Sequence, residues 1–494
     1  MSKKVLIANR GEIVIRIART CRKLGLKSCG IYSNADNDSL HIKHCDQTIN
    51  IGGAMPSESY LRADKIIDAA KKLGCDLIHP GYGFLSENPK FARLCKKEGL
   101  AFVGPPPEVM DFSGDKVRAR KSASKVAAIV DGEEVSNENG ALNLAEKIGY
   151  PVILKAALGG GGRGLRIAKS SEELKKGLIS SKDETVISFG SDRIYIERYV
   201  ENPRHIEVQI LADNSNIIHL GERECSIQRR HQKLIEETPS PALTKEMRNK
   251  ITETAIAIMR EIGYENAGTV EFLFKEGKYY FMEVNARIQV EHPITEEVTG
   301  IDIIEQQLRI ALGEGLSIKQ GKIKPKGHAI ECRINAENPI SFVPFAGIVK
   351  KFVAPEGDGI RVDSALYSGY SIPAFYDSLI AKLICFGKDR SEAIEKMKNS
   401  LLSFRISGIP STIPFHISAL NDKRFVDGSY STSFINEMMS FSSKDGEIAA
   451  AVLSLLPKRI QFLKSEEKED PWMRSRFDWL DALDIHYTED RWNR

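Results

Sequence analysis

The chain of 494 residues lacks long apolar runs and carries a net charge of only +3. No stretch approaches the roughly 18–20 apolar residues of a membrane-spanning helix. The N-terminal "MSKK" passes directly into the strand-like "VLIA", without the apolar region and cleavage site of a signal peptide. We therefore expect a cytoplasmic protein. The near balance of charge gives no reason to expect nucleic acid or a membrane as the main partner.

The sequence also lacks any C-x-x-C pair, since its eight cysteines are scattered singly. This pattern argues against a disulfide framework or a zinc site, and it predicts reduced, mostly buried thiols. The stretch "HIKHC", residues 41–45, contains metal-binding residue types. Because no second cluster accompanies it, we interpret it as a surface helix.

The length of the chain predicts two to four domains, because a single core rarely grows this large. In residues 1–113, short apolar strands alternate with helical stretches, a pattern typical of an open parallel α/β sheet. Residues 114–326 mix strands and helices, and residues 327–440 contain short strands and a helix. Residues 441–494 form a charged tail with three tryptophans, which could contact another subunit. The fold class is α/β, with α+β parts.

The stretch "KAALGGGGRGLRI", residues 155–167, contains a run of glycines. Gly159, Gly161 and Gly164 formally match G-x-G-x-x-G, the dinucleotide-binding fingerprint. That fingerprint needs a helix after the turn, whereas "GLRIAKS" has the alternation of a strand. The run therefore joins two strands. It is either a slack connection or a hairpin lid whose backbone N–H groups bind phosphate.

The segment "TVEFLFKEGKYYFMEVN" places carboxylates on apolar strands, where an unpaired buried carboxylate is costly. A three-residue loop at residues 276–278 would set Glu271 opposite Glu283, with Asn285 on the same face. Such a set of oxygens suits Mg²⁺. A two-residue loop would put the glutamates on opposite faces and contradict the proposal. The alternative is a strand with solvated glutamates on one face.

Cationic side chains elsewhere could meet the phosphates of a nucleotide. They are Lys116, Lys155 and the run "QRRHQK", residues 228–233. Glu197, in the strand "YIERYV", could accept a hydrogen bond from an adenine amino group.

From about Lys3 to about Asn436 the sequence resembles the biotin carboxylases of the ATP-grasp superfamily. The resemblance rests on "IANRGEI", "HPGYGFLSEN", "GDK", "ENPRHIEVQ", "ERECSIQRRHQKLIEE", "GTVEFLF", "MEVNARIQVEHPITE", "GHAIECRINAENP" and "YDSLIAKLI". It implies a Rossmann-like pre-ATP-grasp domain (1–113), an ATP-grasp domain (114–326) with a mobile lid at about 130–204, and a C-terminal biotin carboxylase domain (327–440).

The resemblance assigns roles to individual residues. The implied ATP-binding residues are Lys116, Lys155, Gly160, Gly161, Gly162, Glu197, His205, Gln228, His231 and Lys233. The implied ligands of two Mg²⁺ or Mn²⁺ ions are Glu271, Glu283 and Asn285. The implied bicarbonate pocket comprises Arg287, Gln289, Val290 and Glu291, close to Lys233. Glu291 resembles the general base, and Arg333 resembles the cation that stabilises carboxyphosphate and the biotin enolate.

The implied reaction is MgATP-dependent carboxylation of biotin by bicarbonate through carboxyphosphate. The chain lacks a Met-Lys-Met biotin-attachment motif. We therefore expect a separate subunit that works with a biotin carboxyl carrier protein and a carboxyltransferase subunit, and the resemblance implies a homodimer. The carboxyl acceptor stays open between acetyl-CoA, propionyl-CoA and pyruvate. Leu158 stands where the family keeps a small residue, which could stiffen the lid.

Two other functions compete with this interpretation. The first is another ATP-grasp ligase that acts on a small metabolite through an acyl phosphate; "RIQVEH" with the downstream Arg333 disfavours it. The second is a catalytically silent scaffold subunit, which the intact set of implied catalytic and metal-binding residues disfavours.

Overall fold

The computed structural model describes residues 2–157, 165–189 and 191–439. Residues 1–438 form one compact unit. The glycines Gly160, Gly161 and Gly162, together with Leu158 and the tail 441–494, lie outside the described residues. In the part of the chain that is described, no helix has the length and apolar character needed to cross a membrane.

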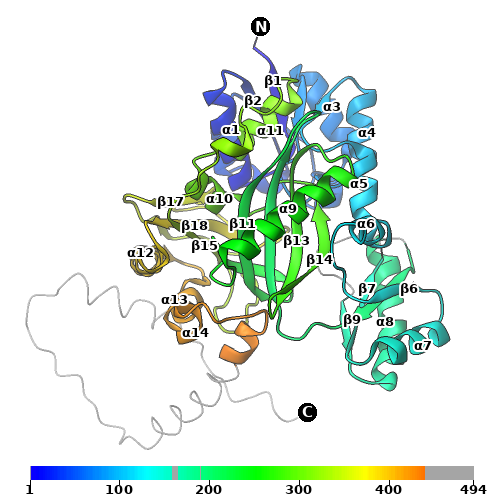
Figure 1. Ribbon diagram of the computed structural model, residues 1–494. Helices are drawn as coiled ribbons and strands as arrows, with labels where there is room; N and C mark the ends of the chain where they lie inside the picture. Colours follow the sequence, from blue (N-terminus) through cyan, green and yellow to red (C-terminus); the bar gives the residue numbers. More distant parts are fainter. Residues whose placement is uncertain (1, 158–164, 190, 440–494) are drawn as a thin grey trace, which may run out of the picture. The chain divides into compact units, whose positions relative to one another are not determined.

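The N-terminal region, blue in Figure 1, contains a parallel five-stranded sheet, as expected. Its strand order is β3-β2-β1-β4-β5. Its strands are β1 (Lys4–Ile7), β2 (Lys27–Tyr32), β3 (Gln47–Asn50), β4 (Leu77–His79) and β5 (Ala101–Phe102). Val5 and Ile7 pack in one hydrophobic cluster with residues of α1 (Glu12–Lys23). Leu6 packs in a second cluster with residues of α3 (Ala63–Leu73) and α4 (Pro89–Lys97). Both faces of the sheet are therefore covered, which explains its continuous apolar strands.

The helix that contains "HIKHC" is α2 (Leu40–His44), but it is not simply a surface helix. His41 is fully buried, where its ring nitrogens contact the Ser39 hydroxyl at 2.7 Å and the Ile31 carbonyl at 3.1 Å. The surface expectation was wrong for this residue because the ring joins α2 to β2. The thiols agree with the prediction: all eight cysteines are free, and seven of them are buried.

An eight-stranded antiparallel sheet forms the middle of the unit, in the order β14-β13-β10-β11-β12-β15-β18-β17. Its strands are β10 (Arg204–Ala212), β11 (Ile217–Arg229), β12 (Gln232–Thr238), β13 (Asn266–Lys275), β14 (Lys278–Asn285), β15 (His328–Asn335), β17 (Ile360–Ser364) and β18 (Leu379–Gly387). β12 pairs with β15, so the sheet continues across residue 327, the proposed domain boundary.

A smaller four-stranded sheet, β6-β9-β7-β8, carries the glycine-rich connection. It contains β6 (Gly132–Val135), β7 (Val152–Ala156), β8 (Arg166–Ala168) and β9 (Ile194–Arg198), with the helices α7 (Glu138–Ile148) and α8 (Ser171–Phe189). β7 and β8 are antiparallel neighbours. This confirms that the glycine run joins two strands, and it excludes the dinucleotide fingerprint. No strand was predicted at residues 132–135, where β6 lies.

The remaining elements surround these sheets. They are the helices α5 (Pro107–Gly114), α6 (Lys116–Ala123), α9 (Lys245–Glu261), α10 (His292–Thr299), α11 (Ile303–Ala311), α12 (Arg390–Ser403), α13 (Ile413–Asn421) and α14 (Lys423–Val426), the strands β16 (Lys351–Val353) and β19 (Arg405–Ser407), and the short helices η1 (Asn34–Asp36), η2 (Pro56–Glu58) and η3 (Gln320–Lys322). The Thr244 hydroxyl caps α9 by accepting from the Met247 N–H.

The β13–β14 hairpin corrects one expectation and confirms another. Its turn has two residues, Glu276 and Gly277, both with positive φ (49° and 77°), rather than three. The register then shifts at Met282, between the pairs Glu271–Glu283 and Phe272–Phe281. This bulge compensates for the shorter turn, because an extra residue in one strand restores the face of those beyond it. Glu271 therefore lies opposite Glu283, as proposed.

Candidate active site

The implied binding residues converge on one cavity of about 1150 Å³. It is bounded by the β11–β12 hairpin, β13, β14, the small sheet and the loops after β1 and β4. The predicted residues that line it are Lys116, Lys155, Glu197, His205, Gln228, His231, Lys233, Glu271, Glu283, Asn285, Arg287, Gln289, Val290 and Arg333. Segments that are far apart in the sequence thus meet at one cavity, which is a candidate ligand-binding site.

Lys233 is the centre of the charge network. Its ammonium group, on β12, donates to Glu207 at 2.5 Å, to Glu271 at 2.9 Å and to Glu291 at 2.6 Å. Burial lowers the pKa of Lys233, but the three carboxylates outweigh this effect, and the pKa is raised well above its ordinary value. The lysine therefore stays charged, with its ammonium group held by three carboxylates.

Glu291 lies behind the cavity wall and directly precedes α10. Its side chain is fully buried, and its two oxygens accept from Lys233 at 2.6 Å and from Arg333 at 2.8 Å. Burial raises the pKa of Glu291, but Lys233, Arg333 and Arg223 together hold it well below its ordinary value. In this arrangement Glu291 is a weak base, and its basicity depends on where those cations lie.

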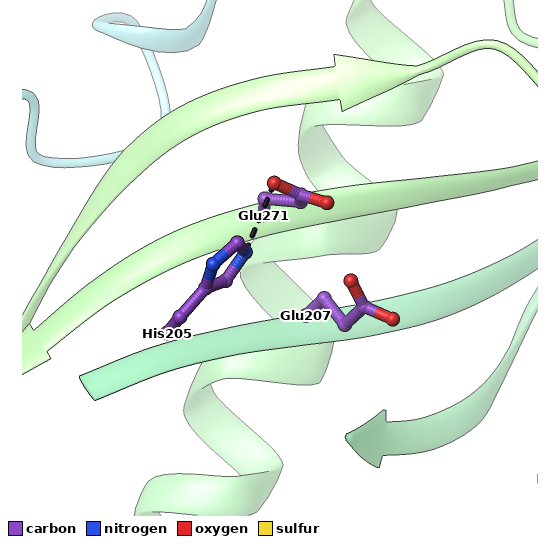
Figure 2. A group of neighbouring side chains, drawn as sticks. All are labelled: His205, Glu207 and Glu271. Atoms are coloured by element: carbon purple, nitrogen blue, oxygen red, sulfur yellow. Dashed lines mark ion pairs between the residues drawn. The ribbon is translucent and has the colours of Figure 1, made fainter. Parts of the chain in front are cut away.

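His205, Glu207 and Glu271 bring potential ligand atoms within 4.8 Å of one another (Figure 2). Glu207 also accepts from Arg223 at 2.5 Å, and the His205 Nε2 atom lies 2.9 Å from a Glu271 oxygen. Burial lowers the pKa of His205, but Glu271 outweighs it and the pKa is raised. Arg223 and Lys233 pair with Glu207, and His205 and Lys233 pair with Glu271, so in this arrangement the cluster is an ion-pair network.

Glu271, Glu283 and Asn285 have the donors that Mg²⁺ prefers. The two glutamates are directly paired across the strands, and Asn285 follows Glu283 by two residues on the cavity wall. Lys116 lies 3.6 Å from Glu283. The buried Asn285 Nδ2 atom makes no hydrogen bond to any described residue, while its Oδ1 accepts from Arg287 at 3.3 Å. Two carboxylates and an amide oxygen beside a lysine fit a magnesium–phosphate site.

Glu197 is engaged in ion pairs. Its carboxylate lies 2.5 Å from the Lys155 ammonium and 2.9 Å from the Arg120 guanidinium, and only 2% of the residue is exposed. Burial raises the pKa of Glu197, but Lys155 and Arg120 outweigh burial, and the pKa is lowered from its ordinary value. Glu197 therefore lines the cavity as a carboxylate that holds Lys155 in place.

Sequence reasoning missed the residues that support the predicted ones, namely Glu87, Arg120, Glu207, Arg223 and Glu236. Glu87 accepts from Arg287 at 2.9 Å, and Glu236 accepts from Arg333 at 2.6 Å. A signal for Glu207 and Glu236 was present, because each lies on an apolar strand, as Glu271 does. The cost of an unpaired buried carboxylate applies to them as much as to the metal hairpin.

Comparison with known proteins identifies the chain. Three family models match it: "Biotin carboxylase, N-terminal domain" at residues 1–110, "Carbamoyl-phosphate synthase L chain, ATP binding domain" at 115–319 and "Biotin carboxylase C-terminal domain" at 331–437. The chain belongs to the biotin carboxylase family. It is an ATP-dependent carboxylating ligase with the function of a biotin carboxylase.

The chain aligns with its relatives over nearly their whole length. Biotin carboxylase 1 of Bacillus subtilis is 50% identical over 88% of this chain and 98% of its own. A pyruvate carboxylase subunit from Methanothermobacter thermautotrophicus is 49% identical over 88% and 90%. The biotin carboxylase domain dimer of Hydrogenobacter thermophilus 2-oxoglutarate carboxylase, solved with MgADP, ADP and bicarbonate, is 45% identical, with a TM-score of 0.86 over 88% and 98%.

Proposed function

We propose that this chain carboxylates biotin held on a biotin carboxyl carrier protein, using MgATP and bicarbonate, as the first half-reaction of a multi-subunit carboxylase. One observation carries the proposal. A single buried ammonium group, that of Lys233, is hydrogen-bonded both to Glu271, the proposed metal ligand, and to Glu291, the proposed base. Phosphate activation and bicarbonate activation thus meet at one cation.

Bicarbonate is a poor nucleophile until it loses its proton. In the described arrangement Glu291 cannot take that proton well, because Lys233 and Arg333 occupy both of its oxygens. An anion bound beside Lys233, Arg287 and Gln289 would compete for these cations. As they turn toward the substrate, the pKa of Glu291 rises and the carboxylate becomes a base. Bicarbonate binding would in this way switch on its own deprotonation.

Transfer of the γ-phosphoryl group to the deprotonated bicarbonate gives carboxyphosphate, with ADP as the leaving group. Lys116, Lys155, His205 and Lys233 would bind the phosphates electrostatically. Glu271, Glu283 and Asn285 would hold Mg²⁺ or Mn²⁺, and we propose two ions per site. When bound, these ions supply positive charge that neutralises the phosphate oxygens. Carboxyphosphate then yields CO₂ and a phosphate that removes the biotin ureido proton.

Arg333 would stabilise the negative charge of the biotin enolate before it attacks CO₂. Its guanidinium lines the cavity but is held by Glu236 and Glu291, at 2.6 and 2.8 Å. Burial lowers the pKa of Arg333, but both carboxylates outweigh it and the pKa is raised. The group therefore stays charged throughout the reaction.

The partners and domain limits are part of the same proposal. We infer a homodimer that acts with a separate carrier protein and a carboxyltransferase subunit. The dimer of the Hydrogenobacter thermophilus domain and the subunit name of the Methanothermobacter relative support this inference. Acetyl-CoA, propionyl-CoA and pyruvate stay the candidate acceptors. The domain limits 1–113, 114–326 and 327–440 also stay proposals.

The experiment is ADP release by the purified chain with MgATP and bicarbonate. Free biotin, or a biotinylated carrier protein, is expected to stimulate this release, and the stimulation should disappear when bicarbonate is removed. If neither form of biotin stimulates it, the proposal is wrong. Stimulation by a small amine or carboxylic acid instead would favour another ATP-grasp ligase.

A further inference from the structure

A buried pair of glutamates lies immediately behind Arg333. Glu236 on β12 is directly opposite Glu331 on β15, and Arg333 is two residues further along β15, on the same face. Both glutamates are fully buried. Arg333 donates from Nε to Glu236 at 2.6 Å, and its Nη2 atom lies 2.5 Å from the same oxygen. Nη2 also donates to Glu291 at 2.8 Å, so one nitrogen bridges the two carboxylates.

Glu331 lacks the compensation that the other buried carboxylates have. Neither of its oxygens accepts a hydrogen bond from any residue that the structure describes, and Glu236 Oε2 is in the same position. Lys382, the cation that acts most strongly on Glu331, pairs with Glu12 at 2.9 Å and donates to the Val290 carbonyl at 3.0 Å. An ionised carboxylate in such a place would cost several kcal/mol, so the group keeps its proton instead.

We propose that this glutamate pair positions Arg333: Glu331 stays protonated, and the single negative charge of the pair resides on Glu236, which holds the guanidinium against Glu291. The inference rests on the proposed function, because it gives Arg333 and Glu291 their roles. Neither Glu236 nor Glu331 lines the cavity, so both are positioning residues. Loss of the charge on Glu236 would release Arg333 from one of its two anchors.

The charges around the pair agree with this division. The titratable groups around it are Arg333 and Cys332 on β15, Lys382 on β18, Lys233 on β12, Cys225 on β11, Glu291 before α10 and Tyr82 in the loop after β4. Glu12 on α1 pairs with Lys382. Burial raises the pKa of Glu331 well above its ordinary value, and Glu236 adds to the rise. Burial also raises the pKa of Glu236, to about 7, although Arg333 opposes it.

The consequence is a pH-dependent position of Arg333. Above about pH 7 Glu236 is ionised and holds the guanidinium; below it Glu236 takes up a proton and the hold weakens. The kcat/KM for free biotin is therefore expected to fall as the pH drops through about 7, while the KM for ATP changes little, because Glu236 does not line the cavity.

The test compares the pH profiles of three variants, each checked for folding and MgADP binding. Glu236→Gln is expected to lower kcat/KM for biotin at pH 8 by at least tenfold. It should also remove the acid limb of the profile, which is the fall in kcat/KM below about pH 7. Glu331→Gln, whose amide resembles a neutral carboxyl, is expected to keep the acid limb. Glu222→Gln is the matched control: it removes a buried glutamate on the neighbouring strand that pairs with Arg248 at 2.6 Å, and it should show the native profile.

Two results would overturn the inference. One is an acid limb that persists in Glu236→Gln; the other is a limb that disappears in Glu331→Gln while MgADP still binds. If Glu236→Gln does not fold, Glu236→Asp replaces it. The shorter carboxylate keeps the charge but withdraws it from Arg333, so kcat/KM should fall at pH 8 as well, and an unchanged value contradicts the proposal. Failure of the native chain to carboxylate biotin would instead contradict the proposed function.

Discussion

Glu236 and Glu237 are neighbours on β12, but they lie on opposite faces of the sheet and have opposite electrostatic environments. Glu236 lies on the face of the sheet that carries Arg333, which is its hydrogen-bond donor, and burial raises its pKa to about 7. Glu237 faces away and accepts from Arg390 at 2.7 and 2.9 Å and from His328 at 2.6 Å, with Tyr430 as a further donor. Burial raises its pKa too, but His328 and Arg390 outweigh it and lower the value to about 2.

The comparison separates two uses of a buried carboxylate. Burial is complete at both positions, so the number of hydrogen-bond donors decides the protonation state. On the outer face the donors saturate the carboxylate and fix the packing of β12, β15 and α12. On the face that carries Arg333, Glu236 and Glu331 have too few hydrogen-bond donors. Carboxyl groups in such an environment can change charge or partner during a reaction.

The largest expected effect comes from removing the Arg333 side chain, the partner of Glu236. Arg333→Ala should lower the rate of biotin carboxylation by roughly 10²–10³-fold, because it removes the cation proposed to stabilise the enolate. Binding of ATP should change far less. The assay is kcat/KM for biotin beside the Kd for ATP. The control is Arg390→Ala, which removes the partner of Glu237 and is expected to retain carboxylation in the folded protein. If Arg333→Ala loses ATP binding and carboxylation equally, Arg333 does not have the proposed role at the enolate.

The next effect concerns stability. Glu237→Gln should reduce the free energy of unfolding by roughly 3–5 kcal/mol, since it leaves the buried His328 and the partly buried Arg390 without their carboxylate. Glu236→Gln should not destabilise the protein at pH 8, because folding of the native chain there must bury a carboxylate that is already ionised and poorly compensated. Urea unfolding of both variants measures the contrast. If Glu236→Gln is destabilised while Glu237→Gln is not, the proposed difference between the two carboxylates is wrong.

A smaller effect lies in the pH dependence of that contrast. The pKa of Glu237 falls from about 4.5 to about 2 on folding, so its stabilisation is complete above pH 4.5 and is lost as the pH falls toward 2. The stability gap between the native chain and Glu237→Gln should therefore narrow as the pH falls from 4.5 to 3. A gap that stays constant over this range would show that Glu237 is not held ionised by its partners.

The smallest effect tests the strand register on which the metal ligands depend. Gly277 adopts φ 77° in the two-residue β13–β14 turn, a conformation that costs little only for glycine. Gly277→Ala should reduce stability by about 1 kcal/mol. The bulge at Met282 lies beyond the turn, so the half-saturating concentration of Mg²⁺ should hardly change. A large change in that concentration would mean that the turn, and not the bulge, sets the pairing of Glu271 with Glu283.

Much of the fold followed from periodicity. The parallel first sheet and the strand pair around the glycine run were predicted because apolar alternation reports local structure directly. The β13–β14 turn was predicted with the wrong length, since a bulge at Met282 leaves no clear signal in the sequence. β6 was not expected, because only Val135 of its four residues is buried.

The site was predicted in its residue types but not in its network. Lys233, Glu271 and Arg333 stand in motifs that resemble the family's, and the structure brings them to one cavity. Their supporting partners, Glu236 and Glu331, could not be paired from the sequence, because β12 and β15 are far apart in the chain and meet only in the folded sheet. Protonation states follow from such contacts, so they could not be predicted from the sequence either.

The most direct measurement is transfer of labelled bicarbonate to free biotin by the purified chain, for the native protein and for Glu291→Gln. The native protein should form labelled carboxybiotin only when ATP and Mg²⁺ are both present. Glu291→Gln should bind ATP yet form little product, because the base is missing. Absence of label with the native protein, or equal labelling by both proteins, would contradict the account.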